Sequence, residues 1–144
     1  MNDIDKLQGF GERRADIGAA LSRLEDALAR PVGAKDEWRA RVGWALDDLA
    51  TVGRVQIAAF LSPGGPLEEA VGRSPRLSGP VDQLRRELPD IEGEADNLQK
   101  KLGEVDPADM RRQLIPFLGR VVRIRQTVAD VMWEAYSVDI GGAG

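Results

Sequence analysis

Apolar residues recur in alternating steps of three and four along four long stretches of this chain, and this spacing constrains the fold more than any other feature. Such a spacing gathers apolar side chains on one face of a helix. None of the stretches shows the alternate-residue pattern of a strand. Proline and glycine separate the stretches at residues 31–33, 62–66, 78–80 and 103–107. The sequence therefore predicts an all-α protein.

The apolar stripes of the predicted helices contain two polar residues, Arg14 in the first stripe and Gln56 in the second. The predicted helices cover about residues 3–30, 36–61, 77–102 and 107–138. Their stripes consist of Leu7, Phe10, Arg14, Ile17, Leu21, Leu24 and Leu28; Trp38, Val42, Ala45, Leu49, Val52, Gln56 and Ala59; Leu77, Val81, Leu84, Leu88, Ile91, Ala95, Leu98 and Leu102; and Met110, Leu114, Phe117, Val121, Ile124, Val128, Val131, Ala135 and Val138.

Four helices that each bury one face, joined by short loops, favour an antiparallel up-down four-helix bundle. We expect residues 1–140 to form this bundle as a single domain and residues 141–144 to form a flexible tail. The longer connection between the second and third helices contains PLEEAVGR, residues 66–73, which predicts a short extra helix.

The helix ends carry recognisable signals. Asp36 and Asp106 are the predicted N-caps, and Pro107 fits the first helical position. Pro89 and Pro116 lie inside helical patterns, where a proline removes a backbone donor, so we expect a kink or a break at each.

Composition excludes several classes of chemistry. The chain has no cysteine and no histidine, which excludes disulfides, thiolate catalysis, catalytic triads and cysteine- or histidine-ligated zinc. The net charge of −4 is a poor match to nucleic acid, which requires phosphate neutralisation. No apolar run is long enough to span a membrane, and the first ten residues lack the pattern of a signal peptide. We therefore expect a cytoplasmic protein without nucleic-acid or membrane partners.

Three segments resemble a known family. These are ADVMWEAYSVDIGG near the end of the chain, LSPGGPLEEAV and SPRLSGPVDQLRREL. Together they are similar to the actinobacterial branch of the haemerythrin-like (HHE) proteins, and the resemblance covers nearly the whole chain. It implies a haemerythrin-like four-helix bundle whose core holds a di-iron centre, with histidine and carboxylate ligands from all four helices.

The metal-ligand positions of that family can be carried over one by one. They fall at Arg14, Gln56, Phe60 or Leu61, Leu88, Glu92, Ile124 and Asp130. Every histidine is missing, and iron in such a site needs several imidazoles in addition to carboxylates. We therefore expect no metal and no other cofactor, and we reject oxygen carriage and di-iron redox chemistry for this chain.

The residues left at those positions define a candidate site. Arg14 and Gln56 lie at similar distances from the loop between the first two helices, so an antiparallel hairpin places them at one level. Glu92 follows Leu88 by about one helical turn. We expect Arg14, Gln56 and Glu92 to cluster in the middle of the bundle, with Asp130 as a fourth ligand-binding candidate. A cluster of this kind is either a polar ligand pocket or an inert plug, and Arg14 can also extend outward to solvent.

Two other groups have both a functional and a structural interpretation. Paired carboxylates suit acid–base catalysis but also occur on solvated helix faces, and aromatic residues line ligand cavities but also fill cores. These groups are Asp130 and Glu134 with Arg120 and Arg123, and Trp38, Trp44, Trp133 and Tyr136.

The favoured function is binding of a small organic molecule, with Arg14 and Gln56 orienting a polar group. It extends to a cofactor-independent enzyme in which Glu92 is the acid or base and Arg14 stabilises negative charge. The alternative is a non-catalytic interaction or regulatory module with an inert core, which binds a protein partner or forms a homodimer. A metal protein that uses carboxylates alone is a third, weaker hypothesis.

Overall fold

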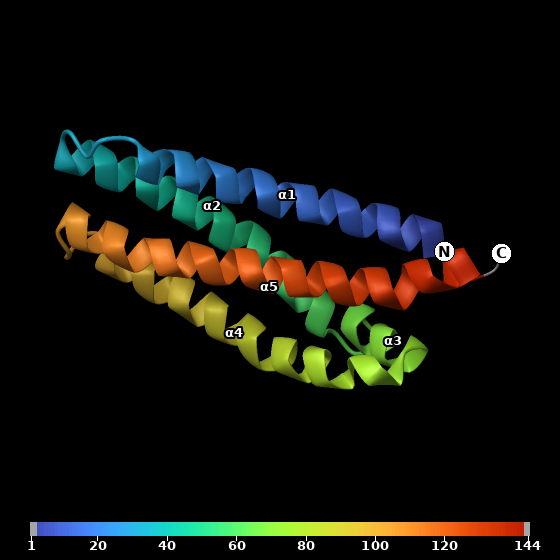
Figure 1. Ribbon diagram of the computed structural model, residues 1–144. Coiled ribbons are helices and arrows are strands. Elements are labelled where there is room, and N and C mark those ends of the chain that lie inside the picture. The colour runs from blue at the N-terminus through green and yellow to red at the C-terminus, as the bar shows by residue number, and fades with distance from the viewer. Residues whose placement is uncertain (1–2, 143–144) are drawn as a thin grey trace.

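The computed structural model describes the backbone of residues 3–142 and, within that range, the side chains of residues 4–6 and 8–136. This part of the chain is all-helical and contains no strand, as the periodicity predicts. The elements are α1 (Asp3–Ala29), α2 (Lys35–Leu61), α3 (Pro66–Arg73), the 3-10 helix η1 (Pro75–Leu77), α4 (Ser78–Lys101) and α5 (Pro107–Gly142) (Figure 1). The predicted short helix at 66–73 is therefore confirmed.

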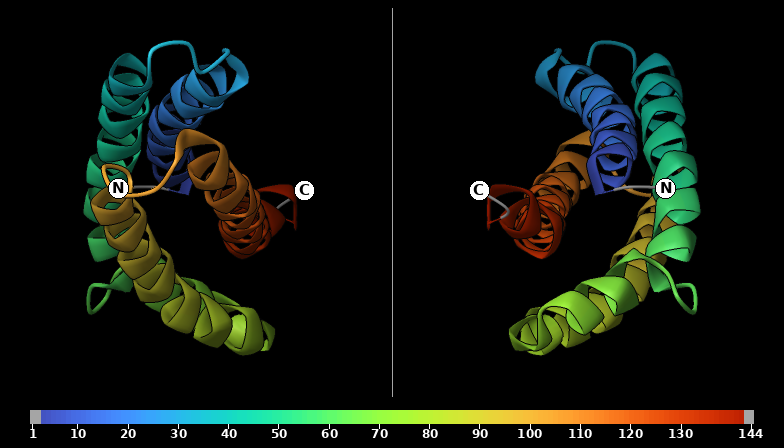
Figure 2. Two further views of the ribbon diagram at one scale, coloured as in Figure 1. Left: turned by 90° about the vertical axis from the view of Figure 1, so that its left-hand side faces the viewer. Right: turned by 90° about the vertical axis from the view of Figure 1, so that its right-hand side faces the viewer.

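The four long helices surround one apolar core. Consecutive long helices run in opposite directions (Figure 1). Helix α1 packs against α2 and α5, and α4 packs against the other sides of the same two helices. The view along the helices shows this arrangement, with α4 bowed along its length (Figure 2). Helix α3 covers one end, where it contacts α5, α2 and α4.

The apolar stripes of α4 and α5 contribute about half of the buried core residues. Every predicted stripe residue of α4 is buried, and all those of α5 from Met110 to Ala135 are buried or half-buried. Near the end of α2 the prediction is wrong by one position, because Ala59 is exposed and the larger Phe60 is buried in its place. The side chains of Leu7 and Val138 lie outside the described residues.

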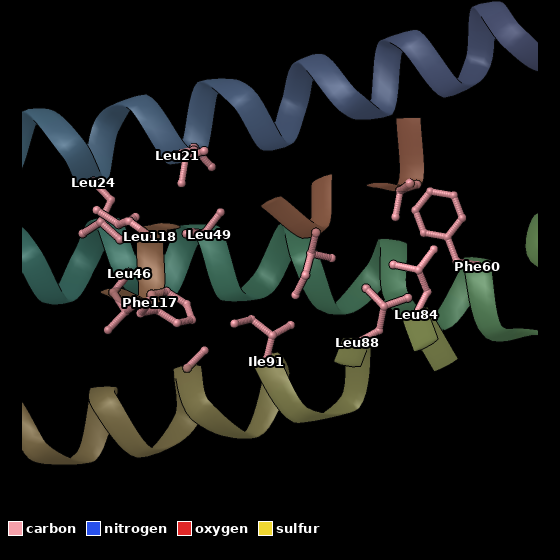
Figure 3. Packing of buried hydrophobic residues seen from close by; sticks show 14 of the residues in the cluster. Leu21, Leu24, Leu46, Leu49, Phe60, Leu84, Leu88, Ile91, Phe117 and Leu118 are labelled. Carbon is pink, nitrogen blue, oxygen red and sulfur yellow. The ribbon is translucent and has the colours of Figure 1, made fainter. Parts of the chain in front are cut away.

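The core is less completely covered beside the N-terminal half of α1 than elsewhere. Helix α1 buries apolar residues of its C-terminal half, including Leu21, Leu24 and Leu28, whereas Phe10, Arg14 and Ile17 are only half-buried. Figure 3 shows the reason, since α1 diverges from α2 toward the end marked by Phe60. The N-terminal half of α1 therefore leaves the core incompletely covered.

Most of the predicted helix ends are confirmed. The Asp106 carboxylate accepts a hydrogen bond from the backbone N–H of Ala108 at 3.2 Å, with Pro107 as the first residue of α5. Asp36 is not an N-cap, because α2 already begins at Lys35 after Ala34. Asp36 lies instead in the first turn, where a negative charge is also favourable.

Residues 78–80 do not break the chain as expected, because Ser78–Pro80 forms the first turn of α4. Helices α4 and α5 also continue through Pro89 and Pro116 without a break. Both prolines are exposed, so water can satisfy the carbonyl groups that lose their helical donors. At the C-terminus, residues 141 and 142 continue α5, and residues 143 and 144 lie outside the described residues.

A charged and aromatic cluster, which we call the end clasp, joins three helices beside α3. It consists of Lys6 of α1, Glu69 and Arg73 of α3, and Tyr136 of α5. Lys6 forms an ion pair with Glu69, and the Tyr136 ring lies 5.7 Å from Lys6 Nζ and 4.5 Å from Arg73 Cζ. Hydrogen bonds from Lys6 and Tyr136 lower the pKa of Glu69 below its ordinary value of 4.5, although burial opposes the shift. The clasp holds the N-terminus of α1 onto the other helices.

The end clasp predicts a pH-dependent contribution to stability. Because the folded-state pKa of Glu69 is lowered, its contribution is present above pH 4.5 and is lost as the pH falls through the lowered pKa. We expect Glu69→Gln to lower the urea midpoint at pH 7 and to leave it unchanged well below pH 4.5. The exposed Glu25→Gln in α1 is the matched control. A deficit of Glu69→Gln that stays constant over this pH range would contradict the role of the clasp.

Candidate functional site

A cavity of about 110 Å³ lies where α1 diverges from the core, and it is partly open to solvent. All four long helices line it, mostly with apolar side chains. The apolar lining consists of Phe10, Ile17, Leu49, Ala50, Gly53, Ile57, Phe60, Leu88, Ile91, Ala95, Phe117, Val121, Ile124 and Val128. In Figure 3, Leu88 and Ile91 project from α4 into this part of the core, and Phe60 projects from α2. The rings of Phe10 and Phe60 meet edge to face, with their centroids 6.3 Å apart.

Polar side chains replace apolar packing where α1 borders the cavity. The Gln56 side-chain amide of α2 donates to the backbone carbonyl of Arg13 at 2.5 Å. From α5, the Arg125 guanidinium donates through Nη2 to the backbone carbonyl of Arg14 at 3.1 Å. These two hydrogen bonds, which we call the α1 bridges, connect α1 to the helices on either side of it. The hydrogen bond from Gln56 explains why a polar residue occupies position 56 in the apolar stripe of α2.

Arg125 lies directly against α1. A Cβ atom added at Gly18 would lie 2.7 Å from Arg125 Nη2, so the absence of a side chain at Gly18 makes room for the guanidinium. Burial lowers the pKa of Arg125, and the positive charge of Arg14 lowers it further. Arg125 nevertheless stays protonated, because its ordinary pKa lies far above neutrality.

Arg14 occupies the same side of the cavity and is half-buried. Its Nη2 lies 3.5 Å from the side-chain oxygen of Gln126, and Gln126 in turn donates to Asp130 at 2.9 Å. The Nε atoms of Arg14 and Arg125 are both buried and have no hydrogen-bond partner. Within the described part of the chain, no carboxylate forms an ion pair with either guanidinium. Two adjacent cations therefore lie uncompensated between α1 and α5, and we call them the arginine pair.

The opposite side of the cavity, between α2 and α4, has compensated charges. Arg54 Nε lies 3.4 Å from the Glu92 carboxylate, and Arg54 Nη2 lies 3.7 Å from that of Asp96. Arg54 and Glu92 line the cavity with their side chains 53% and 33% exposed, so this ion pair lies at the rim. The two sides of the cavity thus differ in charge.

The structure brings three of the four candidate residues to one cavity and differs from the expected cluster in two respects. Arg14, Gln56 and Glu92 line one cavity, but Asp130 is exposed and connects to Arg14 only through Gln126. Glu92 pairs with Arg54 instead of Arg14, because Arg14 and Glu92 lie on opposite sides of the cavity.

Sequence reasoning missed the roles of Arg54 and Arg125. Both flank the apolar stripes instead of interrupting them, so periodicity alone does not mark them. A weak signal was present in the glycine at position 18, which precedes no turn and lies opposite α5.

The four aromatic candidates do not line the cavity. Trp38 and Tyr136 are buried in the core, whereas Trp44 and Trp133 are 67% and 66% exposed. Phenylalanines 10, 60 and 117 line it instead.

Asp130 and Glu134, the candidate carboxylate pair on α5, have different partners. Glu134 pairs with Arg76 of η1 at 2.5 Å, and Asp130 accepts from Gln126. Arg120 pairs with Asp90 and Glu94 of α4. The residues with described side chains include no group of three or more acidic side chains placed to hold a metal ion.

We compared the chain with known proteins in three ways. No protein-family model, no curated protein and no solved structure matched it. No helix in the described part of the chain has both the length and the apolar character to cross a membrane.

The uncompensated charge of the arginine pair predicts the effect of removing Arg14. Arg14 repels Arg125, leaves its own Nε unpaired and forms one long hydrogen bond. We therefore expect Arg14→Met to change the free energy of unfolding by less than about 0.5 kcal/mol or to raise it. Chemical denaturation of the ligand-free protein measures this value.

Arg120→Met is the matched control, since it breaks the ion pairs with Asp90 and Glu94. We expect it to lower stability by up to about 1 kcal/mol. If Arg14→Met lost about 2 kcal/mol or more, Arg14 would be structural and its charge would be compensated in the folded protein.

Proposed function

We propose that this protein is a metal-free four-helix bundle of haemerythrin-like architecture that binds a small organic molecule in the cavity beside α1. The observation that carries the proposal is a hollow in the middle of the apolar core. Natural cores are packed to high density, so an opening of this size has a cost in lost contacts. A bound apolar group would restore those contacts.

The size of the cavity limits the bound group. A dry apolar cavity of about 150 Å³ is known to take up benzene. The present volume of about 110 Å³ suits one ring or a short alkyl chain. Because the cavity is partly open, the rest of a larger ligand can extend to the rim, where the charged side chains lie.

The placement of the carried-over residues supports the proposed ancestry. Six residues at the positions that the resemblance assigns to metal ligands line this one cavity: Arg14, Gln56, Phe60, Leu88, Glu92 and Ile124. Replacement of a metal site by apolar and cationic side chains would leave a cavity of this kind, with the function of the scaffold reassigned.

Binding is better supported than catalysis. The proposed acid or base, Glu92, is paired with Arg54 at the rim and does not contact Arg14. Catalysis by Glu92 together with Arg14 requires both side chains to contact the same reacting group of a substrate. We therefore propose a binding protein, with catalysis by these two residues as an extension that needs a ligand reaching across the cavity.

One observation favours the alternative of an interaction module. Large apolar side chains are exposed on the outer faces of α2 and α5. They are Trp44, Val55, Ile115, Val122 and Trp133. Exposed large apolar side chains are candidates for partner contacts, and a stable dimer with an unoccupied cavity would favour this function.

Filling the cavity tests the proposed function. A Cβ atom at Gly53 would meet nothing within 4 Å, and Gly53 lines the cavity from the interior of α2. We expect Gly53→Leu to stabilise the protein by about 1–2 kcal/mol, through higher helix propensity and new burial, and to abolish binding of 2-phenylethanol. Ligand-observed NMR and chemical denaturation measure the two effects.

The matched control is Gly119→Leu in α5, which is also open at Cβ but is exposed and does not line the cavity. It should gain only the helix-propensity contribution and keep full binding. The proposed function would be wrong if the wild-type protein bound no small apolar probe, or if both variants bound equally well.

A further inference from the structure

We infer that the ligand of this cavity is an amphiphilic carboxylate, whose apolar group fills the cavity while its oxyanion lies between Arg14 and Arg125. The inference rests on the proposed function and adds the chemical class and orientation of the ligand. It follows from the way in which charge is distributed around an apolar space.

The first step is the uncompensated charge of the arginine pair. Arg14 and Arg125 both line the cavity, and no carboxylate in the described residues forms an ion pair with either of them. Partly buried cations of like sign repel one another, as the effect of Arg14 on the pKa of Arg125 also indicates. An anion between them would remove this cost.

The second step is the set of free donors. The Nε–H groups of Arg14 and Arg125 are buried and unpartnered, and in the described part of the chain each guanidinium makes a single hydrogen bond, through Nη2. Other arginines also have an unpartnered buried Nε, namely Arg39, Arg41 and Arg111. None of these three lines the cavity, so only the arginine pair combines free donors with an adjacent apolar space among the described residues. A carboxylate oxygen is the acceptor that suits such donors.

The third step is the asymmetry of the cavity. On the opposite side, Glu92 and Asp96 already compensate Arg54. An anion at that side would meet like charge from two carboxylates, so the oxyanion is directed to the side between α1 and α5. The space between the two sides is apolar and suits the rest of the ligand. A neutral ligand would leave the arginine pair as it is.

The experiment compares carboxylates with neutral alcohols of the same shape. Hexanoate is paired with 1-hexanol and phenylacetate with 2-phenylethanol, so that the two pairs also distinguish an alkyl from an aromatic ligand. Calorimetry at low salt gives the affinities. We expect at least one carboxylate to bind about tenfold or more tightly than its alcohol, with the difference reduced at high salt.

Variants locate the anion. Arg14→Met and Arg125→Met should each bring the ratio of carboxylate affinity to alcohol affinity close to one. Arg14→Met is the cleaner of the two, because both α1 bridges end on backbone carbonyls and stay in place, whereas Arg125→Met removes one of them. Arg123→Met is the matched control, because Arg123 is exposed two positions from Arg125 and does not line the cavity. In wild-type protein, the Nε–H NMR signals of residues 14 and 125 should shift with the carboxylate and not with the alcohol.

The outcomes separate this inference from the proposed function. If alcohol and carboxylate bind equally well, or if Arg123→Met removes the preference, the inference is overturned and the apolar cavity remains the binding site. If no probe binds at all, the proposed function fails and the inference fails with it.

Discussion

The N-terminal half of α1 contacts the core with few apolar side chains, mainly Phe10 and Ile17, and two polar bridges add to these contacts. Gln56 and Arg125 reach from α2 and α5 to the backbone carbonyls of Arg13 and Arg14. A long polar side chain that bonds to the backbone of a neighbouring helix holds the two helices further apart than the direct packing of two leucine side chains would. The cavity, the uncompensated cations and the open rim all depend on this separation of α1 from the core.

The two ends of α1 have different physical anchors. Its C-terminal half buries Leu21, Leu24 and Leu28 in the filled part of the core, and Lys6 near its N-terminus belongs to the end clasp. Between these anchors, α1 spans the cavity. Because polar bridges and exposed ion pairs contribute less than apolar burial, this segment is expected to open more readily than the rest of the protein. A ligand that neutralises the arginine pair would close it.

The sequence predicted the helices well because their apolar spacing is a direct consequence of burial on one face. The stripes of α4 and α5 are almost as predicted, and Arg14 and Gln56 were found because they interrupt such stripes. The prediction that Ala59 is buried was wrong, because the larger of two adjacent apolar residues gains more from burial, and Phe60 is much larger than Ala59. The role of Arg125 and the pairing of Glu92 with Arg54 depend on which helices lie side by side. The periodicity of any one helix does not contain that information.

The central claim is that the middle of the core is open and apolar, and xenon tests it most directly. Xenon binds dry apolar cavities without requiring any particular chemistry. Crystals pressurised with xenon should show a xenon atom among Leu88, Ile91 and Phe117 in the ligand-free protein. If no xenon appears there, and these side chains instead pack against Ile17 of α1, the core is closed and this account is wrong.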